Sequence, residues 1–317
     1  MSKFMKVCAL LALVLIAAGV LLGEVSQFVH GGPVSLGELA DSVTHGQSDS
    51  RLGEWGSNII NELDQVNYNI NDKIMFDSDH EVLSGDVDRY ALESSEDVHG
   101  LDIEVGGCVL TLKSSGDNMC YVEADNAGRF QAYVEGDTLY LKSLTSTNRW
   151  TKVGNRQITL YIPDAILWDE ISIGLGAGRL EFGKLTAEEI SLEVGAGQIV
   201  GELFCVGELN IDVGAGSVEL ADAQVRHLEA DVSMGSLTYA GDITSEAELE
   251  CSMGNIEMDL VGTEKDYDYE LQGTMGGLIV GGQDYSGLGN RKVQDNGAAK
   301  RIAAECSMGN IEIRFRD

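Results

Sequence analysis

Apolar and polar residues alternate one by one over most of the chain from about residue 98 to the end, as in 109–113 (VLTLK). Short runs of this kind, rich in Val, Ile, Leu and Tyr, are typical of half-buried strands. In the second half of the chain each run leads into a turn of small residues, and these turns at first keep a 19-residue period. The turn glycines are Gly178, Gly197, Gly216, Gly235 and Gly254, followed at wider spacing by Gly276 and Gly309.

The repeat predicts coils of two short strands each. Apolar residues stand seven, five and three positions before each glycine and return two and four positions after it, as in Ile171, Ile173, Leu175, Leu180 and Phe182. A unit this short cannot bury its apolar face alone, so it must stack on its neighbours, with equivalent residues about 4.8 Å apart. We therefore predict an all-β fold, namely a right-handed parallel β-solenoid of about 19-residue two-strand repeats.

The N-terminal region has a different pattern. Residues 7–23 are apolar and uncharged and follow Lys3 and Lys6. At about 1.5 Å per residue they span roughly 25 Å, close to a bilayer core, and no small-x-small cleavage site follows them. An uncleaved transmembrane helix is favoured over a cleaved signal, with the N-terminus cytoplasmic and the body extracytoplasmic. We predict a single-pass membrane protein with an anchor in 1–23, a spacer with one short helix in 24–95, and a β-repeat domain in 96–317.

Acidic residues dominate the composition, with 52 Asp and Glu against 21 Lys and Arg and a net charge of −31. Phosphate binding needs concentrated basic residues, so we expect no nucleic-acid partner. One outward-facing repeat position is acidic in most coils, and like charges about 4.8 Å apart in water repel by about 0.9 kcal/mol. Divalent cations such as Ca²⁺ are one candidate for neutralising this ladder, and solvent with salt is the other. The ladder consists of Glu193, Asp212, Asp231, Glu250 and Glu305, with Gln272 interrupting it.

Two cysteines occupy inward positions of the repeat. Cys251 and Cys306 each stand in the sequence ECSMGNIE, in the register of core valines such as Val232. If the coils stack in chain order, two steps of about 4.8 Å separate the two thiols, which is too far for a disulfide. We expect buried structural cysteines at both places. Cys108 and Cys120 flank a turn, and a disulfide between them stays open.

The sequence contains no convincing nucleotide-binding, metal-binding or catalytic motif. Gly174, Gly176 and Gly178 resemble a dinucleotide-binding fingerprint, but another strand follows where that motif needs a helix, so turn glycines are the better interpretation. The histidines form no metal-binding pair, and no nucleophile elbow is present. We expect no enzyme, no cofactor, and no catalytic, cofactor-binding or metal-binding residues.

The segment 281–300 interrupts the period. It ends in a basic cluster on an otherwise acidic chain, and insertions in solenoids usually emerge as loops on one face, often the binding face. We therefore expect a binding loop there. The cluster consists of Arg291, Lys292, Lys300 and Arg301.

The repeats resemble a known family. The stretches ITLYIPDA, LEVGAGQI, LNIDVGAGSVEL and LECSMGNIEMDL, behind a lysine-flanked anchor, are similar to the bacterial β-strand-repeat domain labelled "putative adhesin", a domain of unknown function. The resemblance covers about residues 98–317 and implies a β-solenoid on a cell-envelope protein, without catalytic residues to carry over. We expect a non-enzymatic, adhesin-like domain that binds a cell-envelope or membrane protein. The alternatives are an accessory or sensor component of an envelope-stress system and a polysaccharide-active enzyme.

Overall fold

The computed structural model describes residues 74–94, 98–144, 156–164, 166–286 and 290–316. The chain divides into two units, 1–60 and 61–317, and all the described residues belong to the second. Within those ranges there is no helix with the length and apolar character to span a bilayer. The predicted anchor at 7–23 and the predicted spacer helix lie outside the described residues.

The described part is built from strands, which confirms the all-β prediction. The first strands are β1 (Leu83–Ser94), β2 (Gly100–Val105), β3 (Val109–Ser114), β4 (Met119–Glu135), β5 (Thr138–Ser143) and β6 (Gln157–Ile162). The repeats follow as β7 (Trp168–Leu175), β8 (Arg179–Val194), β9 (Gln198–Val213), β10 (Ser217–Val232), β11 (Ser236–Cys251) and β12 (Asn255–Val261). The chain ends with a short 3-10 helix (Glu264–Asp266), β13 (Tyr267–Gly273), β14 (Gly277–Val280), β15 (Gln283–Asp284), β16 (Asn290–Gln294), β17 (Lys300–Cys306) and β18 (Asn310–Arg316).

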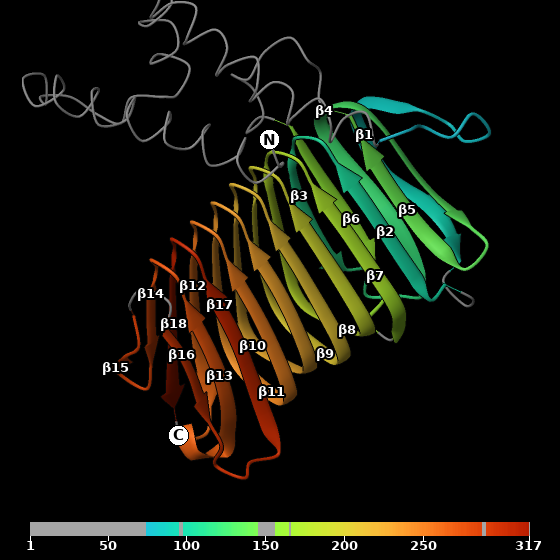
Figure 1. The fold of residues 1–317 in the computed structure, drawn as a ribbon. Coiled ribbons are helices and arrows are strands. Elements are labelled where there is room, and N and C mark those ends of the chain that lie inside the picture. Colours follow the sequence, from blue (N-terminus) through green and yellow to red (C-terminus); the bar gives the residue numbers. More distant parts are fainter. Residues whose placement is uncertain (1–73, 95–97, 145–155, 165, 287–289, 317) are drawn as a thin grey trace, which may run out of the picture. The chain divides into compact units, whose positions relative to one another are not determined.

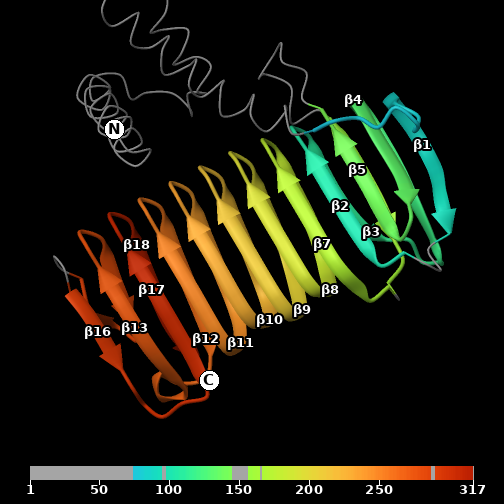
Figure 2. The same cartoon turned by 45° about the vertical axis from the view of Figure 1, so that its right-hand side comes forward.

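The repeats stack as parallel coils in the predicted register. Ser217 of β10 pairs with Gln198 of β9 on one side and with Ser236 of β11 on the other, so each step along the stack advances the sequence by one repeat. Figures 1 and 2 show these strands side by side, with a tight turn joining the two strands of a coil. The inward residues form buried rows across the coils. One such row is Ile171, Ile190, Leu209, Leu228, Ala247, Ile302 and Tyr269, each at most 3% exposed.

The last coil of the chain does not occupy the end of the stack. β17 pairs with β11 on one side and with β13 on the other, and β18 likewise lies between β12 and β14. Figure 2 shows the red strand β17 between orange strands that precede it in the sequence. The chain-order stacking that we predicted is therefore wrong at this end.

The same arrangement occurs at the other end. β2 lies between β5 and β7, and β3 lies between β6 and β8, so the coil built from β5 and β6 is outermost although β2 and β3 precede it in the sequence. At both ends of the stack, the order of the last two coils in space is therefore the reverse of the order expected from the sequence.

Antiparallel strands cover both open ends of the stack. β4 pairs with β5 and with β6, and β1 pairs along β4. At the opposite end β16 pairs with β13, and β15 pairs with β14. Exposed parallel edges invite pairing with other chains, so these strands protect the ends. β1 lies within 24–95, the stretch that the sequence analysis assigned to a spacer. Its pairing with β4 has repeated register shifts, which interrupt the alternation of apolar and polar residues by which a strand is predicted.

The glycine period follows from the closeness of successive turns. A Cβ atom on Gly235 would lie 2.6 Å from Cγ1 of Val213 and closer still to the carbonyl oxygen of Gly216, the turn glycine of the preceding coil. Any side chain at this position would push the coils apart, so only glycine allows the stack to keep its spacing.

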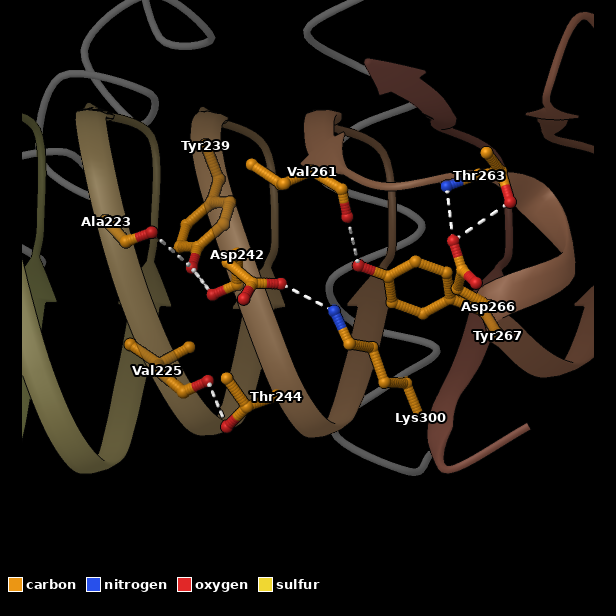
Figure 3. A network of polar contacts seen from close by, with 10 residues as sticks. All are labelled: Ala223, Val225, Tyr239, Asp242, Thr244, Val261, Thr263, Asp266, Tyr267 and Lys300. Carbon is orange, nitrogen blue, oxygen red and sulfur yellow. Dashed lines mark hydrogen bonds and ion pairs between the residues drawn. The ribbon is translucent and has the colours of Figure 1, made fainter. Parts of the chain in front are cut away.

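Polar contacts fix the inserted C-terminal coil (Figure 3). The Lys300 ammonium group donates to the Asp242 carboxylate of β11 at 2.7 Å and lies 5.1 Å from the ring centroid of Tyr267. The Tyr267 hydroxyl donates to the carbonyl of Val261 at 3.0 Å, so this buried phenol has a partner. Lys300 therefore connects the inserted coil to the coils on both of its sides.

Candidate binding surface

The predicted acidic ladder is continuous in the structure. We call it the acidic row: its members are exposed and lie on adjacent strands, each in register with the next. Because β17 inserts beside β11, Glu305 follows Glu250 directly, and Gln272 lies beyond Glu305 instead of interrupting the row. The members are Glu193, Asp212, Asp231, Glu250 and Glu305.

More carboxylates share this face, which we call the acidic face. Glu229 and Glu248 are exposed register partners two positions before the acidic row. Glu189 and Glu208 are exposed register partners four positions before it. Burial raises the pKa of Glu250, and the charges of Asp231 and Glu305, among others, raise it further. Glu250 thus lies between carboxylates of the same charge on both sides along the row.

An exposed methionine row borders the acidic row along the turns. Met234, Met253, Met308 and Met275 occupy the same turn position in successive coils, and each backbone N–H donates to the carbonyl of the coil before it. Met234, Met308 and Met275 are 47%, 41% and 63% exposed, and Met253 is half-buried. Methionine adapts its shape to irregular apolar partners, so this row offers a deformable apolar strip beside the negative charge.

The opposite face of the coils is different. Arg179 pairs with Glu181 and contacts Gln198, and Arg314 pairs with Glu257 at 3.2 Å and with Glu312 at 2.9 Å. Positive and negative side chains are interspersed there, so the strong single-sign charge is a property of the acidic face.

The basic cluster of the interrupted repeat does not form a separate binding loop. Residues 283–284 and 290–294 form the covering strands β15 and β16, and Lys300 and Arg301 belong to β17. Arg301 bridges Glu246 at 2.6 Å and Glu270 at 3.5 Å, and Arg291 also pairs with Glu270. These cations neutralise carboxylates at one end of the acidic face. The expectation of a free loop is therefore wrong for the described residues of this segment, and binding by its basic side chains stays a prediction.

The cysteines confirm one prediction and correct another. Cys251 and Cys306 are 2% and 0% exposed, as their inward register predicts. They are nevertheless direct register partners on β11 and β17, so the predicted separation of two coils is wrong. Contact between the two thiols, together with burial, raises the pKa of Cys306. Cys108 and Cys120 are both buried free thiols, and burial raises the pKa of Cys108 to about 12.

A cleft of about 500 Å³ lies where β3, β6 and β8 end or bend. Leu112, Ile162 and Phe182 contribute apolar surface to it, and Lys113 and Lys184 contribute positive charge. The cleft lies at the bends of a few strands, whereas the acidic row crosses five adjacent coils.

One cluster escaped the sequence patterns. Asp77, His80 and Glu135 place ligand atoms within 4.8 Å of one another. Asp77 and His80 lie in the stretch assigned to the spacer, and Glu135 ends a strand far along the chain. Only the Asp-x-x-His spacing is visible in the sequence, and by itself it is a weak signal.

Residues 98–316 match the family described as Toastrack DUF4097. The chain belongs to this family. The match confirms the predicted resemblance to a β-strand-repeat domain of unknown function, and its start coincides with the beginning of the coils. No curated protein matches this Toastrack chain.

Several solved structures resemble this Toastrack domain at low identity. A "putative adhesin" from Bacteroides fragilis is 13% identical over 73% of this chain and 96% of its own, with a TM-score of 0.40. A "putative lipid binding protein" from Parabacteroides distasonis is 15% identical over 75% and 97%, with a TM-score of 0.39. A "putative cell adhesion protein" from Clostridium sporogenes is 10% identical over 75% and 99%, with a TM-score of 0.26. Because these scores are low, the assignment depends on the family match.

Proposed function

We propose that this protein is a membrane-anchored, extracytoplasmic, non-enzymatic binding domain whose acidic face docks a cationic amphipathic segment of a cell-envelope or membrane protein. The observation that carries the proposal is the parallel course of the acidic row and the methionine row over the three coils that hold Asp231, Glu250 and Glu305. The right-handed sense of the solenoid, the single membrane helix at 7–23 and the spacer behind it stay predictions, as does Ca²⁺ on the acidic row.

The acidic row and the methionine row would contribute to binding in different ways, through charge attraction and through apolar contact. The carboxylates of Asp231, Glu250 and Glu305 attract lysine and arginine side chains and favour fast association. The exposed side chains of Met234 and Met308 give the apolar side of such a segment a surface to cover. A segment with one basic and one apolar side would satisfy both rows at once.

The test uses the full chain and a synthetic amphipathic helix of lysine and leucine as the probe. The triple variant Asp212→Asn, Asp231→Asn, Glu250→Gln removes charge from the acidic row. The matched control, Glu202→Gln, Glu219→Gln, Asp222→Asn, removes the same charge from exposed positions outside the acidic face. Affinity is measured over a range of salt concentrations for both variants and for the unmodified chain.

We expect the acidic-row variant to bind at least about tenfold more weakly and with a shallower salt dependence, because screening acts on the pairs that were removed. The control should change affinity less than about twofold, because non-contacting charges act weakly through water. A variant with Met234→Ser, Met253→Ser and Met308→Ser should weaken binding while keeping the salt dependence. Equal losses in the acidic-row variant and its control would reduce the attraction to net charge and contradict the proposal.

A further inference from the structure

The cluster of Asp77, His80 and Glu135 lies at the outer end of the stack, away from the acidic row. Asp77 and His80 belong to the segment that leads into β1, and Glu135 is the last residue of β4. Their nearest ligand atoms, one from each side chain, all lie within 4.8 Å of one another. The fold thus brings an imidazole and two carboxylates together from segments that are distant in the sequence.

A buried glutamine holds the backbone of the two ligand residues in the leading segment. The side chain of Gln131 accepts from the Asp77 N–H at 2.8 Å and donates to the carbonyls of Asp77 and His80 at 2.7 and 2.9 Å. Gln131 is 0% exposed, so water does not compete for these bonds. The segment is therefore fastened to β4 at the two residues whose side chains face Glu135.

The imidazole is also held in place. The His80 ring stacks on the Tyr133 ring, with centroids 3.7 Å apart and planes 10° apart. The backbone N–H of Asp79 donates to Asp77 Oδ1 at 2.7 Å and orients that carboxylate. Contacts of this kind orient ligands in metal sites.

We propose that Asp77, His80 and Glu135 bind a divalent transition metal ion of the Zn²⁺ class. One imidazole nitrogen with two carboxylates suits Zn²⁺, whereas Ca²⁺ and Mg²⁺ prefer all-oxygen ligand sets. Zinc–ligand bonds of about 2.0–2.2 Å place the ligands of a tetrahedral ion roughly 3.4 Å apart. The three groups, which lie within 4.8 Å of one another, would therefore draw together by at most about 1.4 Å. Rotation of the exposed Glu135 side chain can supply that movement, and the fourth position stays open to water.

The bound ion would fasten the leading segment to the β4 end. Gln131 already holds the backbone of this segment, and the metal would add a link through the side chains of His80 and Glu135. We therefore expect Zn²⁺ to protect residues 74–82 from proteolysis and to raise the melting temperature, since a ligand that binds only the folded state stabilises it.

The experiment titrates the full chain with Zn²⁺ by calorimetry, with excess Ca²⁺ present to occupy weak oxygen sites on the acidic face. Unmodified protein should bind one Zn²⁺ at this site. His80→Ala and Glu135→Gln should each weaken that binding at least about tenfold and abolish the zinc-dependent rise in melting temperature. The matched controls, Asp79→Asn beside the cluster and His227→Ala on the acidic face, should bind like the unmodified chain.

Circular dichroism without metal separates loss of the site from loss of the fold. If His80→Ala unfolds, Glu135→Gln decides the question, because Glu135 is exposed at the end of β4. Cobalt gives a further measure, since its visible spectrum reports ligand identity and should change in both variants. Zinc affinity unchanged by His80→Ala and Glu135→Gln, or lowered equally by the controls, would overturn the proposal.

Discussion

Replacing one turn glycine by alanine tests the reason for the 19-residue period. In Gly235→Ala the added Cβ would stand 2.6 Å from Val213 Cγ1 and against the Gly216 carbonyl oxygen. The carbonyl belongs to the backbone of a packed coil and cannot rotate away, so the coils must separate locally. Overpacking of this kind costs about 1–3 kcal/mol. We take about 3 kcal/mol because the added Cβ would clash with a backbone oxygen and with a side chain.

An opposing effect must be subtracted. Alanine lowers the entropy of the unfolded chain and stabilises by about 0.4–1 kcal/mol, which leaves a net loss of about 2–2.5 kcal/mol. For a domain of this size each kcal/mol lowers the melting temperature by about 2–4 °C, so we expect a fall of roughly 4–10 °C.

The matched control is Gly183→Ala. A Cβ at Gly183 meets no atom within 4 Å, and neither glycine has a positive φ, so the two variants differ in contact alone. Thermal melts followed by circular dichroism should show the control unchanged or slightly more stable. Equal melting temperatures for the two variants would refute the explanation of the period by close contact between turns.

Three further predictions concern charge, the inserted coil and the buried thiols. Glu250→Gln should raise the melting temperature at neutral pH, because burial, followed by the neighbouring acids, raises the pKa of Glu250 and makes its ionised form costly in the folded state. The gain should disappear as pH falls through the raised pKa toward its ordinary value of 4.5, and a gain that is constant with pH would contradict this. Lys300→Met removes the ion pair with Asp242, so it should lower the free energy of unfolding by about 1–3 kcal/mol and speed hydrogen exchange in β17. Lys292→Met, on the exposed edge strand, should do neither, and equal exchange in the two variants would contradict the role of Lys300 in holding the inserted coil. Cys108, with a pKa of about 12, should resist a thiol reagent at pH 8 until the protein is denatured, as mass spectrometry of the labelled peptide would show; rapid labelling of the native chain would contradict its burial.

The sequence predicts what depends on local pattern. Alternation and the glycine period place Leu192, Val213 and Ile256 in the core and Asp231 on the surface, because side-chain direction in a strand alternates. The family motifs identify the fold for the same reason. The positions of these residues within each coil were therefore accessible before the structure.

Coil order was not accessible in this way, because each coil presents a similar parallel edge to any other. The insertion of β17 beside β11 depends on long-range pairing, and it changes the neighbours of Cys306 and Glu305. One signal was present in the duplicated ECSMGNIE: its two copies stack directly, and Asn310 donates to Asn255 at 3.1 Å. The cluster at Asp77 was hidden because Asp77 and His80 lie in the irregular segment before β1, while Glu135 ends β4 far along the chain, so only long-range pairing brings them together.

Disulfide trapping tests the inserted coil, on which the continuous acidic row depends. Glu248 and Ala303 are register partners on β11 and β17, within the range of Cα separations that disulfides span. In chain-order stacking Glu248 would instead adjoin Glu270, which in this structure pairs with Ala303 on the far side. We predict that Glu248→Cys with Ala303→Cys cross-links under mild oxidation, whereas Glu248→Cys with Glu270→Cys, about 9.6 Å apart, does not. Efficient linkage of the second pair and none of the first, identified by peptide mass spectrometry, would contradict the account.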